Sequence, residues 1–188
     1  IHCQALLLHL GISQEQAQSR MRQLEPVEMR LELKAGINRC VLVNDFYNND
    51  LSSLRIALQF AARQARAGKF TLILSDILQS GQEKDHLYEK VAAAVRESKV
   101  TRLIGIGTEI PALGAKLGTE VETVFFPDTD ALIHDFQRLD FRDELVLLKG
   151  ARPFAFERIA RRLEQKAHKT VLEVNLTAMV HNLNVYNR

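Results

Sequence analysis

This chain of 188 residues lacks the features of several specialised classes of protein. It has only two cysteines, Cys3 and Cys40, and this small number excludes a disulfide-stapled scaffold. It has no tryptophan. No apolar run approaches the roughly 20 residues that a membrane-spanning helix needs, and the opening segment lacks the basic flank and cleavage site of a secretory signal. The 25 basic and 23 acidic residues nearly balance and aromatic residues are few, which argues against a nucleic-acid surface. With 46% hydrophobic residues the chain is not disordered, and we expect a globular protein of the reducing cytoplasm.

Residues 1–25 predict a pair of helices. Gly11 is placed to end the first helix as a left-handed cap, and Ser13 with Gln16 is typical of a capping box at the start of the second. Pro26 is expected to stop that second helix.

The middle of the chain alternates between strand and helix patterns. The strand patterns are continuous apolar runs, which indicate strands buried on both faces; they lie at residues 39–44, 70–75, 102–107, 123–126 and 144–149. Helical spacing occurs at residues 51–65, 87–95, 128–136 and 156–167, the last of these beginning through Pro153. The alternation predicts an α/β fold, a three-layer Rossmann-like open sheet with helices on both faces, preceded by a short helical segment. Ligands of such sheets bind beyond the carboxyl ends of the strands.

The last segment departs from this pattern. Residues 170–176 predict a strand, and residues 177–186 a helix, after a polar hinge. We expect the start of another domain here.

The most polar of the predicted strand ends follows the first buried strand. Asp45 stands where a carboxylate can accept hydrogen bonds from ribose hydroxyls. With Tyr47 and Asn48 it forms a denser polar cluster than one turn requires, so we interpret these three residues as functional. For Asn49 and Asp50 we favour a role in the turn and in capping the next helix.

A second strand end, at residues 149–152 (KGAR), has the composition of an anion site. Gly150 permits close backbone approach, a helix N-terminus follows, and Lys149 and Arg152 add positive charge. An ordinary turn with solvated basic residues explains the same pattern equally well.

The remaining candidates carry less chemistry. Asp76 ends a strand and His86 follows soon after, but a histidine in such a place is more often a surface or capping residue. Gly105 and Gly107 lack the third glycine of a dinucleotide fingerprint, so a nicotinamide site is rejected. The 188 residues contain no phosphate-loop motif, no Cys/His cluster with metal spacing and no nucleophile elbow. The residues by themselves thus predict a ligand-binding α/β domain without a complete catalytic set or a metal site.

Three of these segments resemble the signature motifs of the Mur ligases, in the order and spacing of that family. Residues 45–54 (DFYNNDLSSL) are similar to D-x-Y-N-x-N-x-x-S-M, residues 75–81 (SDILQSG) to G-D-M-x-E-L-G, and residues 149–152 to K-G-S-R. Arg30 resembles the arginine at the start of that family's carboxy-terminal domain. The resemblance implies that residues 1–25 end a central ATPase domain and that residues 26–168 form the carboxy-terminal domain.

The tail resembles a second family. Residues 172–183 are similar to the L-E-I-N-L-x-A-L-x-H-N-L pattern of alanine racemases. This implies that residues 169–188 are the first strand and helix of a racemase domain fused to the ligase. Pyridoxal phosphate is then the cofactor of that fused domain and is not bound by this chain. The pairing makes chemical sense, because a racemase supplies D-alanine for the dipeptide that the ligase consumes.

The Mur resemblance implies an ATP-dependent amide ligase of peptidoglycan precursor synthesis. Its closest branch adds D-alanyl-D-alanine to UDP-N-acetylmuramoyl-tripeptide through an acyl-phosphate, with ATP and Mg²⁺. The phosphate loop is expected upstream, so these residues alone are expected to be inactive, and their partners are the ligase's own central domain and the racemase domain. The residues implied to bind the nucleotide are Arg30, Asp45, Tyr47 and Asn48. Those implied to contact the acceptor or another anion are Lys149, Gly150 and Arg152.

The chain also departs from the family's motifs, and two other readings stay open. Asp50, Ala151, Ser75 and Gln79 replace motif residues Asn, Ser, Gly and Glu. One alternative is a free-standing α/β module that binds a nucleotide or phosphate without catalysis. The other is a structural linker, which predicts no nucleotide contact at Asp45.

Overall fold

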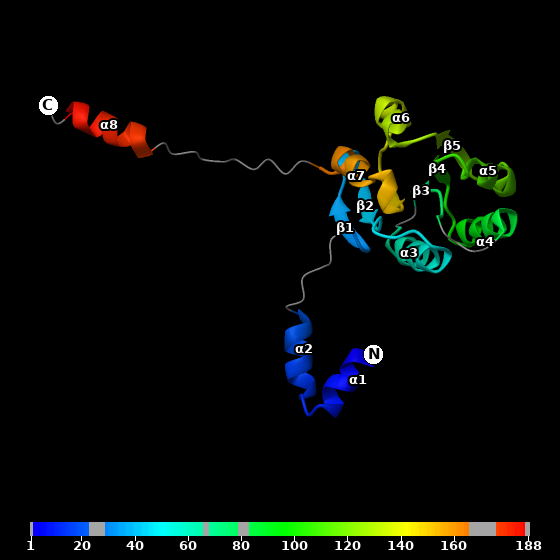
Figure 1. Ribbon diagram of the computed structural model, residues 1–188, viewed down its shortest axis with the longest axis horizontal. Coiled ribbons are helices and arrows are strands. Elements are labelled where there is room, and N and C mark those ends of the chain that lie inside the picture. The colour runs from blue at the N-terminus through cyan, green and yellow to red at the C-terminus, as the bar shows by residue number, and fades with distance from the viewer. Residues whose placement is uncertain (1, 23–28, 66–67, 79–82, 166–175, 187–188) are drawn as a thin grey trace.

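The computed structural model describes residues 2–22, 29–65, 68–78, 83–165 and 176–186. Its body is a six-stranded sheet in the order β1-β2-β6-β3-β4-β5 (Figure 1). The strands are β1 (Glu32–Ala35), β2 (Val41–Asn44), β3 (Lys69–Ser75), β4 (Arg102–Ile106), β5 (Glu122–Phe126) and β6 (Glu144–Lys149). All neighbouring strands pair in parallel except β1, which runs antiparallel to β2.

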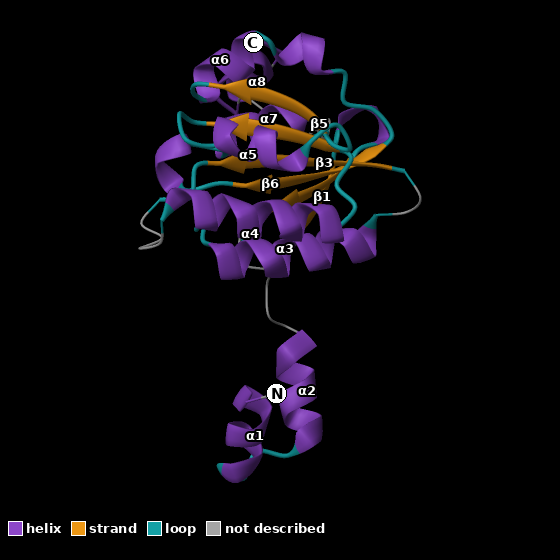
Figure 2. Cartoon of the chain, turned by 90° about the vertical axis from the view of Figure 1, so that its right-hand side faces the viewer, coloured by secondary structure: helices purple, strands orange, loops and turns teal. Residues whose placement is uncertain are grey.

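Helices cover both faces of the sheet, so the predicted three-layer α/β class is confirmed. One face carries α3 (Leu51–Gln64), α4 (Lys84–Glu97) and α5 (Pro111–Leu117), and the other carries α6 (Thr129–His134) and α7 (Glu157–Leu163). Figure 2 shows α3 and α4 side by side against one face. The central strand β6 is buried along its whole length, as expected for a strand whose apolar run is continuous.

The crossovers bring three loops together. The chain passes from β2 to β3 through α3, and later returns through α6 to insert β6 between these two strands. The carboxyl ends of β2, β6 and β3 are therefore neighbours. This is the topological switch point, where open α/β sheets bind ligands.

Several boundaries differ from the predicted ones. Neither β1 nor α5 was predicted. The strand expected at residues 39–44 begins only at Val41, because Asn38 and Arg39 adopt positive φ angles of 49° and 62° in a preceding turn. The helix expected at residues 156–167 spans only Glu157–Leu163. Pro153 belongs to a separate 3₁₀ turn, which Ala155 ends with a φ of 49°.

The described residues of the terminal segments include the helices α1 (His2–His9), α2 (Gln14–Arg22) and α8 (Leu176–Tyr186). Gly11 has the predicted left-handed φ, 80°, and the Gln16 N–H donates to Ser13 Oγ at 3.2 Å. Pro26 lies outside the described residues, and so does the strand expected at residues 170–176 except Leu176, which already belongs to α8. Within the described part of the chain, no helix is long and apolar enough to cross a membrane.

Candidate functional site

A buried ion pair joins the loops that follow β2 and β6. Lys149 Nζ lies 2.9 Å from Asp45 Oδ2, and the lysine side chain is only 1% exposed. The ammonium also donates to the backbone oxygen of Asn48 at 2.5 Å. An ammonium so deeply buried requires such partners. In this structure Lys149 therefore fixes the polar loop after β2.

A second connection joins the loops after β2, β3 and β6 through Ser75. Its Oγ accepts from Asn49 Nδ2 at 3.1 Å and from the Ala151 N–H at 2.9 Å, and it donates to the Asp76 backbone oxygen at 3.0 Å. The Asn49 amide also donates to the backbone oxygens of Ser75 and Asp76. Asn49 therefore has a structural role, as favoured from the sequence, but it ties two strand ends together and does not cap α3.

The predicted cap of α3 is present at Asp50. Its Oδ1 accepts from the Ser53 N–H at 2.9 Å, and Ser53 Oγ completes a capping box. This backbone donor lowers the pKa of the Asp50 carboxyl below its ordinary value of 3.8.

Asp76 and the G-x-G segment have a structural explanation. The Asp76 carboxylate accepts from the backbone N–H groups of Thr108, Glu109 and Ile110, at 2.7–3.3 Å, where the chain turns into α5. Gly107 has a φ of +134°, and a Cβ there would lie 2.3 Å from this carboxylate. The rejected nicotinamide site is thus a helix-capping loop.

Tyr47 holds two arginines from distant parts of the chain. The Arg30 guanidinium carbon lies 4.6 Å from the centre of the tyrosine ring, and that of Arg152 lies 4.7 Å from it. Such cation–π contacts position a guanidinium while leaving its N–H edge free for an anion. Arg30 and Arg152 are exposed, and Tyr47 is 38% exposed.

The four residues expected to bind a nucleotide line one cavity of about 290 Å³. These are Arg30, Asp45, Tyr47 and Asn48, joined by Leu31, Ser53 and Ile56. One oxygen of Asp45 faces Lys149, and the other makes no hydrogen bond to any residue that the structure describes. The cavity therefore offers a carboxylate acceptor beside an exposed guanidinium.

The three residues expected to meet an acceptor or anion are placed differently from one another. Arg152 is exposed and contacts the Tyr47 ring, whereas Lys149 is enclosed by its hydrogen-bonding partners. Gly150 is required by packing, because a Cβ there would lie 2.7 Å from the Phe156 ring.

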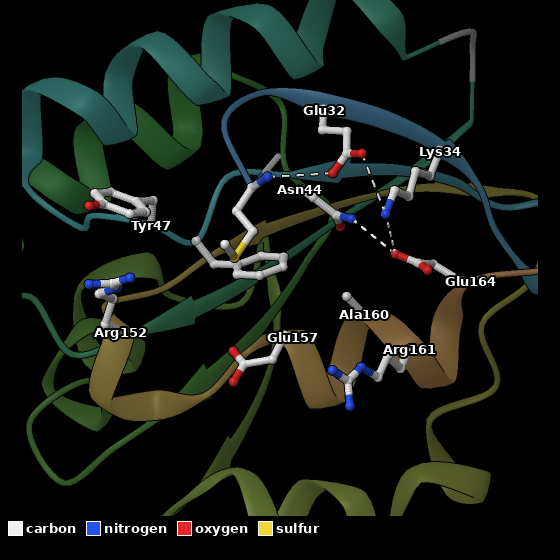
Figure 3. Close-up of a pocket in the computed structure, with 11 residues that line it drawn as sticks. Glu32, Lys34, Asn44, Tyr47, Arg152, Glu157, Ala160, Arg161 and Glu164 are labelled. Atoms are coloured by element: carbon white, nitrogen blue, oxygen red, sulfur yellow. Dashed lines mark hydrogen bonds and ion pairs between the residues drawn. The ribbon is translucent and has the colours of Figure 1, made fainter. Parts of the chain in front are cut away.

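Sequence reasoning missed a neighbouring cleft of about 420 Å³ (Figure 3). Its lining includes Asn44, Glu157, Arg161 and Glu164, which come from β2, from α7 and from the residue after α7. The missed signal was Asn44, a buried polar residue that ends the apolar strand β2. His86 is exposed on α4, and among the residues described there is no cluster of His, Cys, Asp or Glu that could hold a metal ion.

Comparisons with known proteins match this part of the chain to one family. The model described as "Mur ligase, glutamate ligase domain" matches residues 29–152. The UDP-N-acetylmuramoyl-tripeptide–D-alanyl-D-alanine ligase of Bacillus subtilis is 26% identical over 158 residues, which are 82% of this chain. The ligase of the same name from Escherichia coli is 24% identical over 163 residues, or 86% of the chain. The chain spans 35% of the length of each.

Solved structures show the same fold. MurF from Acinetobacter baumannii superimposes with a TM-score of 0.68 at 20% identity, over 82% of this chain and 35% of that one. The MurF ligase of Thermotoga maritima, determined in complex with ADP, gives a TM-score of 0.65 at 14% identity, over 84% of this chain and 35% of that one.

Proposed function

Because this chain belongs to the Mur ligase family, we propose that it serves as the carboxy-terminal part of an ATP-dependent ligase that adds D-alanyl-D-alanine to UDP-N-acetylmuramoyl-tripeptide. In this reaction ATP phosphorylates the tripeptide's terminal carboxylate. The dipeptide amine then displaces phosphate to form the amide. The observation that carries the proposal is that the four residues expected to bind nucleotide line one cavity at the sheet's switch point.

The cavity's chemistry suits a nucleotide brought by another part of the ligase. Arg30 supplies an exposed guanidinium for a phosphate group, and its stacking on Tyr47 reduces the entropy lost on binding. The free oxygen of Asp45 accepts from ribose hydroxyls, and Asn48 lies beside it. Mg²⁺ and the phosphate loop are assigned to parts of the ligase other than these residues, since the 188 residues contain no phosphate-loop motif.

Arg152 is assigned to the acceptor side of the same reaction. Its guanidinium carbon lies 4.7 Å from the centre of the Tyr47 ring, and Arg152 lines the second cleft. There it binds the acceptor carboxylate or the negative charge that develops as the acyl-phosphate reacts. Lys149 contributes indirectly, by holding Asp45 and the Asn48 backbone in place.

For residues 169–188 we retain the hypothesis of a fused alanine racemase domain that uses pyridoxal phosphate. It rests on the sequence pattern alone, of which α8 is the described part. In this arrangement one polypeptide both makes D-alanine and consumes the dipeptide built from it.

Replacing Arg30 tests the nucleotide role. In the full polypeptide that carries this chain, we expect Arg30→Gln to raise the KM for ATP by about tenfold, because one charge-assisted contact is lost. The measurement is phosphate release as a function of ATP concentration, with UDP-N-acetylmuramoyl-tripeptide and D-alanyl-D-alanine present.

Arg55→Gln is the matched control, since Arg55 is exposed on α3 and does not line the cavity. It should leave the KM for ATP unchanged. Equal kinetics for Arg30→Gln and the parent would contradict the nucleotide role. Phosphate release that does not require the dipeptide would contradict the proposed reaction.

A further inference from the structure

Two of the chain's departures from the family motifs meet at one hydrogen bond. Ser75 stands where the motif of residues 75–81 has glycine, and Ala151 stands where the motif of residues 149–152 has serine. The two positions are 76 residues apart in the chain, yet the Ala151 N–H donates to Ser75 Oγ at 2.9 Å. They are neighbours because β6 pairs with β3 in parallel. A hydroxyl that is missing on one side of this contact is therefore present on the other.

The Ser75 hydroxyl is buried and fully used. Ser75 is 0% exposed. Its Oγ donates to the Asp76 backbone oxygen at 3.0 Å, and it accepts from Asn49 Nδ2 at 3.1 Å and from the Ala151 N–H. One donor and two acceptor positions are all that a hydroxyl has. Ser75 therefore has no hydrogen-bonding capacity left for a ligand, and any effect that it has on a ligand passes through its partners.

Of these partners, the Ala151 N–H depends most on the hydroxyl. Asn49 Nδ2 also donates to the backbone oxygens of Ser75 and Asp76, at 3.1 and 3.2 Å, so it keeps two acceptors without Ser75 Oγ. The Ala151 N–H has no second acceptor among the described residues. Removing the hydroxyl would leave this donor unpaired, and the loop would have to move to satisfy it.

The Ala151 N–H fixes the start of the turn that carries Arg152. Ala151 directly precedes the 3₁₀ turn Arg152–Phe154, which has no side-chain cap. The bond to Ser75 orients the peptide from which Arg152 extends to Tyr47, where its guanidinium carbon lies 4.7 Å from the ring centre (Figure 3). Because Arg152 is exposed, the tyrosine ring and the backbone of this turn are what hold it in place.

We propose that Ser75 is the positioning residue of Arg152, and that its hydroxyl on β3 replaces the hydroxyl that position 151 lacks. The loss at position 151 and the gain at position 75 are then one compensated exchange. That Arg152 meets the acceptor rests on the proposed function. The placement of Arg152 by Ser75 does not, so the two statements can fail separately.

The side-chain N–H signal of Arg152 in NMR spectra of the 188-residue chain tests the positioning. The ring current of Tyr47 displaces this signal, and Tyr47→Leu gives the undisplaced reference. In Ser75→Ala we expect the Arg152 signal to lose at least about half of its displacement, and the Ala151 amide to exchange about tenfold faster with solvent. The Arg30 signal should stay displaced, because Arg30 contacts the ring without touching the Ser75 hydrogen bonds.

Thr71→Val is the matched control, with the folds of both variants checked by circular dichroism. Thr71 is also 0% exposed on β3, and its hydroxyl bonds to Glu144 near the other end of the strand. This variant should lose stability and leave the Arg152 signal unchanged. An unchanged Arg152 signal in Ser75→Ala, or an equal effect of the two variants on it, would overturn the positioning role.

Moving the hydroxyl back to position 151 tests the compensation. Ser75→Gly should displace Arg152 as Ser75→Ala does. Ser75→Gly/Ala151→Ser should restore at least about half of the lost ring-current displacement, because a serine Oγ can lie close to its own backbone nitrogen and reach Asn49. A double variant that resembles Ser75→Gly alone would overturn the claim that one hydroxyl replaces the other.

Ligase kinetics of the full polypeptide that carries this chain separate this inference from the proposed function. We expect Ser75→Ala to raise the KM for D-alanyl-D-alanine by about tenfold and to change the KM for ATP less than about twofold. In an Arg152→Gln background the same substitution should add nothing, because it acts through Arg152. A displaced Arg152 with unchanged kinetics would contradict the acceptor role and support the positioning role. Altered kinetics with Arg152 in place would overturn the positioning role.

Discussion

At the scale of single residues, the same few side chains combine structural and chemical work. Asp45 gives one oxygen to the buried ammonium of Lys149, and the proposed function assigns the other to a ligand. The sequence predicted that Asp45 and Lys149 both lie near the site, because both end parallel strands. It could not predict that they pair, since this depends on β6 lying next to β2. An ammonium that looks available in the sequence is thus enclosed in this structure.

The Asp50 cap makes the stability of this domain depend on pH. Its pKa is lower in the folded state than the ordinary 3.8, so its contribution is complete above that value and is lost as the pH falls through the folded pKa. We expect Asp50→Ala to lower the unfolding free energy by about 1 kcal/mol near pH 7. The loss should shrink below about pH 4.

Urea unfolding at a series of pH values measures this difference. Asp50→Asn is the control, because an asparagine side chain still accepts from the Ser53 N–H. It should lose much less stability than the alanine variant. A difference between parent and Asp50→Ala that stays constant from pH 7 to about pH 3 would contradict the charged cap.

At the scale of elements, long buried patterns were predictable and short ones were not. The strand at 144–149 was predicted with its observed bounds, because its apolar run is continuous. In the structure every residue of this strand is buried. The edge strand β1 has only four residues, ELKA, and half of its positions are exposed, so it shows no apolar signal. Helix α5 is also short and contains Gly114, which weakens a helical pattern. Gly114 is there because a Cβ would lie 2.9 Å from the Phe125 ring.

The junction of β4 and α5 depends on a glycine, which two alanine substitutions can test. Gly107→Ala places a Cβ 2.3 Å from the Asp76 carboxylate, at a φ of +134°. We expect it to lower the unfolding free energy by at least about 2 kcal/mol, from backbone strain and from loss of the α5 cap. Gly118→Ala has a φ of +66° but no atom within 4 Å of the new Cβ. Because Gly118 has a ψ of −149°, a conformation almost restricted to glycine, this variant should lose about 1–3 kcal/mol from backbone strain alone.

Thermal or urea unfolding gives the loss of stability in each variant. The difference between the two losses separates the steric clash with Asp76 from the backbone strain of a positive φ. Hydrogen exchange at the Thr108, Glu109 and Ile110 amides adds a local measurement, because only Gly107→Ala displaces their acceptor. Equal losses of stability and equal exchange in both variants would mean that the Asp76 cap contributes nothing.

At the scale of the whole molecule, the fold was predictable from alternation, and so was the end of the sheet that carries the candidate site. The second cleft was not, because its residues come from β1, β2 and α7, which meet only in the folded chain. The charges of Lys34, Glu157 and Arg161 look like ordinary surface residues in the sequence. The domain boundaries expected at residues 25 and 168 stay predictions.

The proposal that this chain supplies part of a ligase active site leads to the last prediction. It has a guanidinium and a carboxylate at one cavity, but its sequence has no phosphate loop to bind the rest of the nucleotide. Most of the affinity of a phosphate loop comes from its backbone N–H groups and its lysine. We therefore expect the 188-residue chain to show no saturable ATP binding by calorimetry up to about 1 mM, the upper end of ordinary KM values. We also expect no amide product by mass spectrometry. Tight ATP binding by the chain alone would favour the free-standing nucleotide-binding module, and amide formation by it would show that the catalytic set is complete without a phosphate loop.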